Sequence, residues 1–206
     1  MGGKLNRAEA LVIAAVSFFA CTGVVGMLAL DAPEPLRLIE PPLDPFPAFP
    51  GVEAPVDAIR WFDLVRPHCN SVEVDTRMRW QPAPPTPDGD MYKAACYALA
   101  GRMAQARETI ESLPPGLRYA AAGVVFEAGH PAADAGDDIA AGPLMELVLE
   151  YAPHHYMALY HAGTARFQQG DYGLARKYLE SFLVEYRVQD GWTLNATSML
   201  ERMSER

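Results

Sequence analysis

Two segments of this chain share one spacing of glycine, alanine and arginine. Gly101 stands five residues before the pair Ala106-Arg107, and Gly170 stands five residues before Ala175-Arg176. The two glycines are 69 residues apart, which is close to two periods of roughly 34 residues. Because apolar residues recur at helical spacing on both sides of each glycine, the spacing predicts two copies of one helical hairpin.

The segment around Gly170 resembles the tetratricopeptide repeat. The resemblance places Gly170-Asp171-Tyr172 at the turn, with small and apolar positions before it (Leu159, Ala162, Gly163, Phe167) and after it (Ala175, Leu179, Phe182). The upstream copy matches through Ala94, Tyr97, Gly101, Ala106, Ile110 and Leu113. Arg166 departs from the pattern, since the family usually has an aromatic residue there. The resemblance implies an all-α domain of about three stacked hairpins over residues 89–191, because one hairpin cannot bury its apolar face alone.

A less regular copy is expected between these two. Its first helix is predicted over residues 118–128, and its second is predicted from Pro143 to Pro153. The segment 129–142 between them, GHPAADAGDDIAAG, is longer than a repeat turn and predicts an inserted loop. After the last copy, residues 192–206 predict a capping helix, whose apolar face consists of Trp192, Ala196, Met199, Leu200 and Met203.

Residues 56–88 precede the repeats and predict a short helix followed by an extended segment. The helix is expected over 56–66, ending at Pro67. The following SVEVDTRMRW alternates apolar and charged residues, with Val72, Val74, Met78 and Trp80 on one side. This period of two predicts a half-buried strand. With no second strand to pair with it, the strand would lie on a helical surface or join the sheet edge of a partner.

The amino-terminal region predicts a membrane anchor. Residues 10–30 are 21 residues without a charge, enough for a transmembrane helix of about 31 Å. Lys4 and Arg7 precede this run and acidic residues follow it, so residues 1–9 are expected in the cytoplasm and the rest in the periplasm. A cleaved signal peptide and a lipoprotein-like box at residues 18–21 are alternatives. The uninterrupted apolar run favours a retained single-pass anchor in the inner membrane.

Two features near the anchor suggest contacts with partner proteins. Small residues on one face of the predicted membrane helix (Ala10, Ala14, Ser17, Cys21) favour close docking of another transmembrane helix, although small residues are also common in such helices. Residues 31–55 contain eight prolines and predict an extended stalk. Phe46 and Phe49 in this stalk are candidate anchors in an apolar groove of a neighbour, or incidental aromatic residues.

Two cysteines fall in the exported part of the chain. Cys69 and Cys96 are 27 residues apart, and in an oxidising compartment they are candidates for a disulfide worth roughly 3 kcal/mol. The alternative is a pair of buried thiols, since their spacing matches no zinc or redox motif.

The sequence predicts no catalytic site, metal or cofactor. It contains no glycine-rich phosphate loop, nucleophile elbow or H-E-x-x-H motif. His154 and His161 lack further ligands at helical spacing, and His130 with Asp134, Asp137 and Asp138 is interpreted as part of a solvated acidic loop rather than a cation site. The formal net charge of −9 and the absence of a basic stretch argue against nucleic-acid binding.

The remaining candidate site is the concave face that the first helices of such repeats form. The residues expected there are Met91, Ala95 and Leu99 in the first copy and Met157, Tyr160, Thr164, Phe167 and Gln168 in the last. This apolar face suits an extended or helical segment of a partner protein, or the chain's own residues 56–80. The sequence thus predicts a non-catalytic periplasmic scaffold, an accessory subunit of a membrane complex such as a respiratory or photosynthetic one. The alternative is a transient assembly factor that binds client proteins in the groove.

Overall fold

A computed structural model describes residues 56–205, and within this range every regular element is helical. The α-helices are α2 (Val56–Val65), α3 (Val74–Trp80), α4 (Pro87–Leu99), α5 (Met103–Ser112), α6 (Arg118–Asp134), α7 (Asp138–Tyr151), α8 (Tyr156–Gln168), α9 (Tyr172–Glu185) and α10 (Gly191–Ser204), with short 3-10 helices at Arg66–His68 and Pro115–Leu117. The predicted all-α class is confirmed for these residues. None of these helices is long and apolar enough to cross a membrane. The predicted anchor, the docking stripe and the stalk residues Phe46 and Phe49 lie outside the described range.

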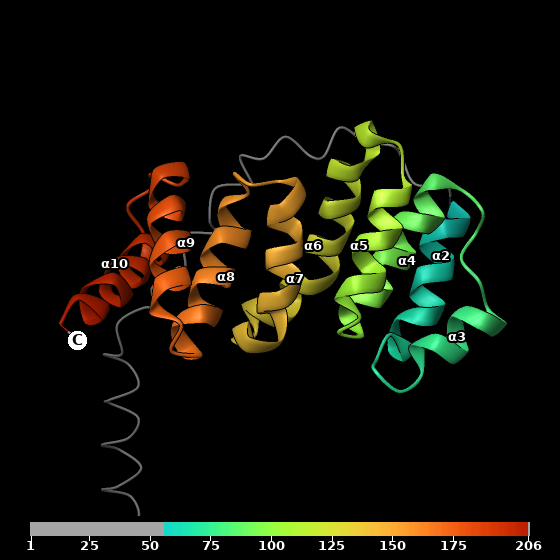
Figure 1. Cartoon of the computed structure of the whole chain (residues 1–206), viewed down its shortest axis with the longest axis horizontal. Helices are drawn as coiled ribbons and strands as arrows, with labels where there is room; N and C mark the ends of the chain where they lie inside the picture. The colour runs from blue at the N-terminus through green and yellow to red at the C-terminus, as the bar shows by residue number, and fades with distance from the viewer. Residues whose placement is uncertain (1–55, 206) are drawn as a thin grey trace, which may run out of the picture. The chain divides into compact units, whose positions relative to one another are not determined.

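Six of the helices form three consecutive hairpins, α4–α5, α6–α7 and α8–α9. Figure 1 shows these helices side by side in chain order, and each packs against its hairpin partner. Neighbouring hairpins also contact each other, since α4 packs against α6 and α7 packs against α8. Stacking buries the apolar faces in a continuous core from α2 to α8, followed by a second cluster over α8, α9 and α10. This is the arrangement expected of a helical repeat.

All three hairpins turn at a glycine in the left-handed region. Gly101, Gly136 and Gly170 have φ of 73°, 89° and 80°, and they are 35 and then 34 residues apart. Each turn has the same pair of backbone hydrogen bonds. At the middle turn the Gly136 amide donates to Ala133 over 2.8 Å, and the Asp137 amide donates to Ala132 over 3.0 Å. This is a Schellman motif, in which a glycine at positive φ satisfies the last carbonyls of a helix.

The middle hairpin is therefore regular, and the predicted inserted loop at 129–142 is wrong. Residues 129–134 continue α6, and residues 138–142 already belong to α7. Pro131 and Pro143 lie inside these helices. Because a proline inside a helix removes a hydrogen bond and is normally disfavoured there, the two prolines obscured the helical pattern. Asp137 begins α7, its side chain accepting a hydrogen bond from the Ala140 amide over 3.1 Å.

With Gly136 as its turn, the middle hairpin obeys the same spacing as the other two. Five residues after each turn glycine stands a buried alanine (Ala106, Ala141, Ala175), and seven residues before it stands a small residue (Ala94, Gly129, Gly163). A Cβ atom on Gly129 would lie 2.7 Å from Leu144, and one on Gly163 would lie 2.8 Å from Leu179. These small residues therefore let the two helices of a hairpin approach closely.

The positive φ of Gly136 gives a prediction with a matched control. Gly136→Ala is expected to lower the free energy of unfolding by about 1–2 kcal/mol, because an L-residue is disfavoured in the left-handed region. Gly116→Ala is the control. No atom lies within 4 Å of a Cβ built at either position, but only Gly136 has a positive φ. Chemical denaturation followed by circular dichroism measures both variants, and equal effects would contradict this account of the turn.

The arginine residues of the repeated motif tie the first and the last hairpin to a neighbouring element, whereas the middle hairpin has Gly142 at this position. Arg107 on α5 donates through Nε to the Glu150 carboxylate on α7 over 2.7 Å. Arg176 on α9 donates to the Ser204 hydroxyl of α10 over 3.3 Å. Arg166, which replaces the expected aromatic residue, makes two hydrogen bonds of 2.6 Å to Glu146 on α7. A charged pair thus joins the middle and the last hairpin at that position.

The strand predicted over residues 71–80 is also wrong, since this segment contains helix α3. Val74 is buried and Met78 is partly buried against the core, whereas Val72 and Trp80 are exposed. Positions 74 and 78 fit both a period of two and a helical spacing of four residues, so a short window could not separate the two. Asn70 starts the helical turn, its side chain accepting hydrogen bonds of 3.0 Å from the amides of Val72 and Glu73.

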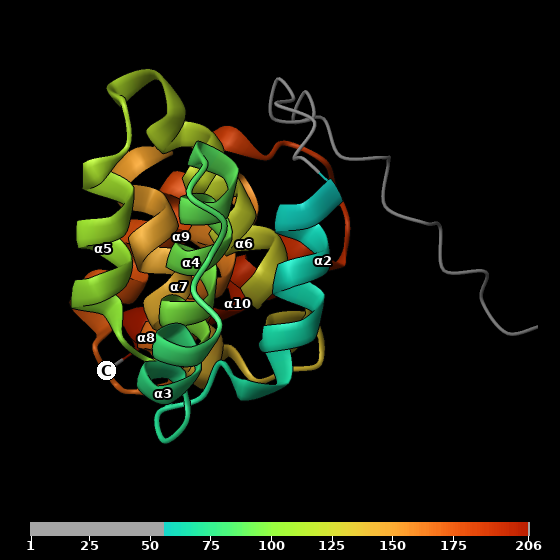
Figure 2. The same ribbon diagram turned by 90° about the vertical axis from the view of Figure 1, so that its right-hand side faces the viewer.

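Helix α2 matches the predicted short helix and packs against α4. Figure 2 shows α2 and α5 on opposite sides of α4. Two further contacts hold this end of the domain together. Cys69 and Cys96 form a disulfide with Cα atoms 5.0 Å apart, and the indole of Trp61 donates to the Gln81 carbonyl over 2.9 Å. The disulfide fixes residues 56–81 to the first hairpin, and the hydrogen bond joins two parts of this segment to each other.

Helix α10 forms the predicted carboxy-terminal cap. Asp190 begins it with a capping box that includes Thr193. Three of the five apolar residues expected on its inner face are buried (Ala196, Met199, Met203), and the other two, Trp192 and Leu200, pack partly buried against the same cluster. The exposed side of the last hairpin is thus covered by a helix from the same chain.

Candidate functional site

Most residues expected to line a partner groove are not available on the surface. Met91, Ala95, Tyr160 and Thr164 are buried, Leu99, Met157 and Phe167 are partly buried, and Gln168 alone of the predicted set is exposed. A partner could reach the buried ones only after the helices separated. The predicted groove residues therefore contribute mainly to the core of the domain.

The capping helix explains the burial of Tyr160. The ring of Trp192 on α10 meets the Tyr160 ring edge-on, with centroids 4.8 Å apart. The Asn195 side chain donates to the Tyr160 hydroxyl over 2.5 Å. Burial raises the pKa of Tyr160 above its ordinary value, while the hydrogen bond with Asn195 opposes that rise. Tyr160 is thus a packing residue between α8 and α10.

An apolar groove lies instead between α2, α4 and α6, and we call it the α2–α6 groove. Its volume is about 340 Å³. One side of the groove consists of small and apolar residues of α6. The other side, which we call the α2 wall, consists of residues of α2 together with Tyr92 on α4. The residues that define it are Ile59, Phe62, Tyr92, Ala120, Val124 and Ala128, with Asp63, Arg66 and Glu127 among the charged residues of its lining. This groove is on the first-helix side of the hairpins, where the repeat pattern placed a binding surface.

The α2 wall of this groove is firmly attached to the repeats. The rings of Phe62 and Tyr92 pack with centroids 5.1 Å apart, and the Arg66 guanidinium lies 5.9 Å from the centre of the Phe62 ring. Burial raises the pKa of Tyr92, and the carboxylates of Asp88 and Asp63 raise it further.

Sequence reasoning missed the α2–α6 groove because it considered only the first and last copies. The signal was present in the sequence VDAIRWFDLVR, where Ile59 and Phe62 are three residues apart on one face of a helix. Helix α2 buries Phe62 but leaves Ile59 40% exposed. The exposed Ile59 beside the buried Phe62 thus gives the groove an apolar edge.

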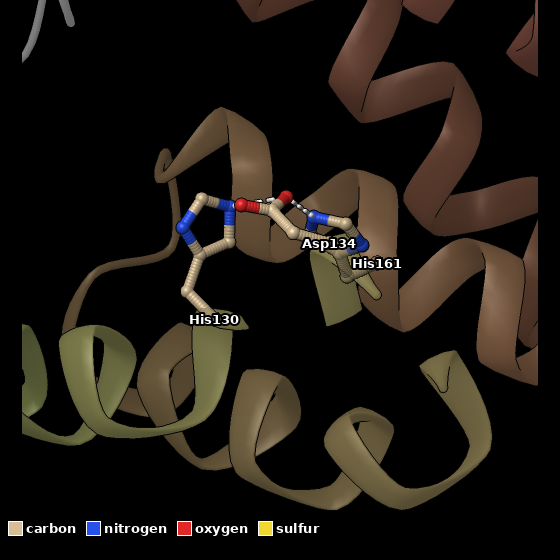
Figure 3. Close-up of side chains that lie close together, drawn as sticks. All are labelled: His130, Asp134 and His161. Carbon is tan, nitrogen blue, oxygen red and sulfur yellow. Dashed lines mark ion pairs between the residues drawn. The ribbon is translucent and has the colours of Figure 1, made fainter. Parts of the chain in front are cut away.

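A second cluster of polar side chains lies at the turn between α6 and α7. Figure 3 shows His130 and Asp134 from the end of α6 pointing toward His161, which projects from α8. One ligand atom from each residue lies within 4.8 Å of those of the other two. The Nε2 atom of His130 is 3.2 Å from the Asp134 carboxylate, and that of His161 is 3.9 Å from it. On its other side His161 contacts Asp138 through Nδ1 over 2.8 Å.

The structure separates the histidines that the sequence considered together. His154 is exposed and pairs with Glu185 over 2.7 Å. Glu185 is not a member of the cluster of His130, Asp134 and His161. His161 instead joins His130 and Asp134, which the loop interpretation had placed in solvent. The missed signal is the spacing of four residues between His130 and Asp134, which puts both on one face of α6.

Comparison with family models, with curated proteins and with solved structures finds no match to this chain. The resemblance to the tetratricopeptide repeat, predicted from the spacing around Gly101 and Gly170, therefore stays a prediction.

Proposed function

We propose that this chain is a non-catalytic scaffold, anchored in the inner membrane by residues 10–30, whose helical repeat domain holds a partner protein in the periplasm. In this proposal it is an accessory subunit of a membrane complex, such as a respiratory or photosynthetic one. An extended apolar segment of the partner occupies the α2–α6 groove. The observation that carries the proposal is the apolar α2–α6 groove on the stack of hairpins. Most of the first-helix residues that the sequence predicted for a partner groove are instead covered by other parts of the chain.

The chemistry of the groove supports a peptide as its occupant. A volume of about 340 Å³ is at the small end of binding sites and accommodates one or two apolar side chains. Ala120 and Ala128 keep the α6 side shallow, while Ile59 and Val124 offer apolar contact. Asp63 on α2 and Arg66 in the 3-10 helix that follows it supply charges of both signs, which can pair with polar groups of a segment lying along α2.

The attachment of α2 supports a preformed groove. The Phe62–Tyr92 contact and the Cys69–Cys96 disulfide fix α2 and the residues after it to the first hairpin, and the Trp61–Gln81 hydrogen bond links α2 to the residue after α3. A groove with a fixed wall loses little conformational entropy when a partner binds. The disulfide also supports the exported location, because such bonds persist mainly in oxidising compartments.

The groove proposal is tested by Ile59→Asp in the full-length chain. A carboxylate at the edge of the α2–α6 groove is expected to weaken the partner's retention roughly tenfold or more, because burying an unpaired charge against an apolar segment is unfavourable. The measurement is the amount of partner that co-purifies with the chain in mild detergent, relative to wild type. A subunit co-purifies with one complex at a fixed ratio, whereas an assembly factor is recovered with varying clients at lower occupancy.

Ile139→Asp is the matched control for this test. Ile139 is an exposed isoleucine on α7 and is not part of the α2–α6 groove. This variant is expected to retain the partner as wild type does. Equal loss of the partner from both variants, or from neither, would contradict the groove as the interface.

A further inference from the structure

We propose that His130, Asp134 and His161 form a binding site for a divalent transition-metal ion, and that Zn²⁺ is the ion that fits it best. The site would connect the middle hairpin to the last one, since His130 and Asp134 belong to α6 and His161 belongs to α8. It is independent of the α2–α6 groove and of the proposed function.

The first argument is the buried nitrogen of His161. Its side chain is only 1% exposed, and its Nε2 atom has no hydrogen-bond partner among the described residues. A carboxylate accepts but does not donate, so Nδ1 carries the proton that bonds to Asp138 over 2.8 Å. In this tautomer Nε2 keeps a lone pair that points toward Asp134 and His130. A buried polar atom without a partner is unfavourable, and a metal ion would satisfy it.

The second argument is the convergence of three suitable ligand atoms. Two imidazole nitrogens and one carboxylate oxygen lie within 4.8 Å of one another, and Figure 3 shows them facing a common point. Ligands around a tetrahedral Zn²⁺, with bonds of about 2.0–2.1 Å, are separated by roughly 3.4 Å. The distance of 3.2 Å from His130 to Asp134 already has this value, and the distance of 3.9 Å from His161 to Asp134 is slightly longer.

The third argument is the support behind His161. Metal-binding histidines commonly donate their second ring nitrogen to a carboxylate, which fixes the tautomer and the ring orientation. Asp138 has this position, and it is itself nearly buried at the start of α7. The ring of His161 is also held edge-on by Tyr160 and Trp192, at 5.3 Å and 5.8 Å between centroids. On the other side Phe126 stacks on His130 at 4.5 Å. Asp138 is a positioning residue, and the aromatic rings form a wall around the site.

The ligand set selects the class of ion. Two imidazoles and one carboxylate suit Zn²⁺, Cu²⁺ and Ni²⁺, whereas Ca²⁺ and Mg²⁺ need sites built from oxygen ligands. Three protein ligands leave a fourth position of a tetrahedral ion free for water or a partner's side chain. The Asp134 side chain is 51% exposed while that of His161 is enclosed, so the cluster is open to solvent on the Asp134 side.

The competing explanation is a structural ion pair. A doubly protonated His161 would donate to Asp138 and attract Asp134, with no ion required. The two explanations differ in metal stoichiometry, because only the first needs His130 as a ligand.

The test is the zinc content of the untagged full-length chain in mild detergent. After removal of bound metal with a chelator, the chain is dialysed against buffered Zn²⁺, and the bound metal is quantified by elemental analysis. We expect one Zn²⁺ per chain. Loading with Co²⁺ instead is expected to give the visible d–d absorption of a four-coordinate nitrogen and oxygen site.

Substitutions assign the ligands. Asp138→Asn removes a supporting carboxylate and is expected to lower the zinc affinity roughly 10–100-fold. His130→Gln and Asp134→Asn each remove a ligand from a partly or half-exposed position, and each is expected to lower the affinity at least as much. His154→Gln is the matched control, because His154 is 78% exposed and pairs only with Glu185 outside the cluster. It is expected to leave the affinity unchanged. Circular dichroism verifies that the variants keep their helical content.

Two results would overturn the proposal. One is a wild-type chain that retains its helical content yet binds no Zn²⁺ above background, which would leave His161 as an ion-paired structural residue. The other is zinc binding that His130→Gln and Asp134→Asn leave unchanged, or that His154→Gln weakens equally, since the ion would then be bound elsewhere.

Discussion

Phe182→Ala is expected to destabilise the helical domain by about 3–5 kcal/mol, the range for truncating a buried phenylalanine. Phe182 is fully buried on α9, in the cluster that joins the last hairpin to the capping helix. Its ring contacts Tyr160 edge-on at 5.2 Å and stacks on Tyr186 at 5.3 Å between centroids. The substitution therefore removes two aromatic contacts and leaves a cavity between α8 and α9. Thermal unfolding followed by circular dichroism should show a lower midpoint, by on the order of 10 °C.

Val184→Ala is the control for this prediction. Val184 is also on α9 but its side chain is 60% exposed, so its truncation is expected to change the free energy of unfolding by less than about 0.5 kcal/mol. If Phe182→Ala were as mild as Val184→Ala, the packing of α9 against α8 and α10 would be wrong.

Removal of the disulfide is expected to have the next largest effect. The double variant Cys69→Ala with Cys96→Ala should lose about 2–5 kcal/mol, because the bond closes a loop of 27 residues and restricts the unfolded chain. The loss should also loosen the wall of the α2–α6 groove, since Cys69 follows α2 and Cys96 lies on α4. Chemical denaturation of the chain in mild detergent measures the change.

A reducing agent provides the control for the disulfide. Reduction should destabilise the wild-type chain to about the level of the double variant and should leave the double variant unchanged. A wild-type chain with the same stability under oxidising and reducing conditions would contradict a contribution from the bond.

Two of the three hairpins were predictable from the sequence because local signals agreed there. Around Gly101 and Gly170 the turn glycine, the small residues and the buried alanine all indicate the same hairpin. At Gly136 the same spacing is present, but Pro131 and Pro143 lie inside the flanking helices and signal a break in the pattern. Tertiary packing overrides that signal, because both helices are enclosed by their neighbours in the core.

The sites were less predictable than the fold. Whether Tyr160 is open or buried depends on where α10 lies, and no pattern within α8 records that position. His130 is on α6 and His161 is on α8, so the two side chains meet only because both helices pack against α7. The error over α3 has a more local cause, since Val74 and Met78 fit both a strand and a helix. The sequence did contain a sign of the helix, because Asn70 is followed three residues later by Glu73, a pattern typical of a helix start.

The proposed scaffold role is tested most directly by site-specific cross-linking in native membranes. A photo-reactive amino acid at Ile59 reports on the α2–α6 groove, and the same amino acid at Val184 reports on an exposed position of α9. The account predicts one dominant adduct from position 59, with the same protein that co-purifies with the chain at a fixed ratio, and little of that adduct from position 184. A chain that purifies alone and gives equal, diffuse adducts from both positions would contradict it.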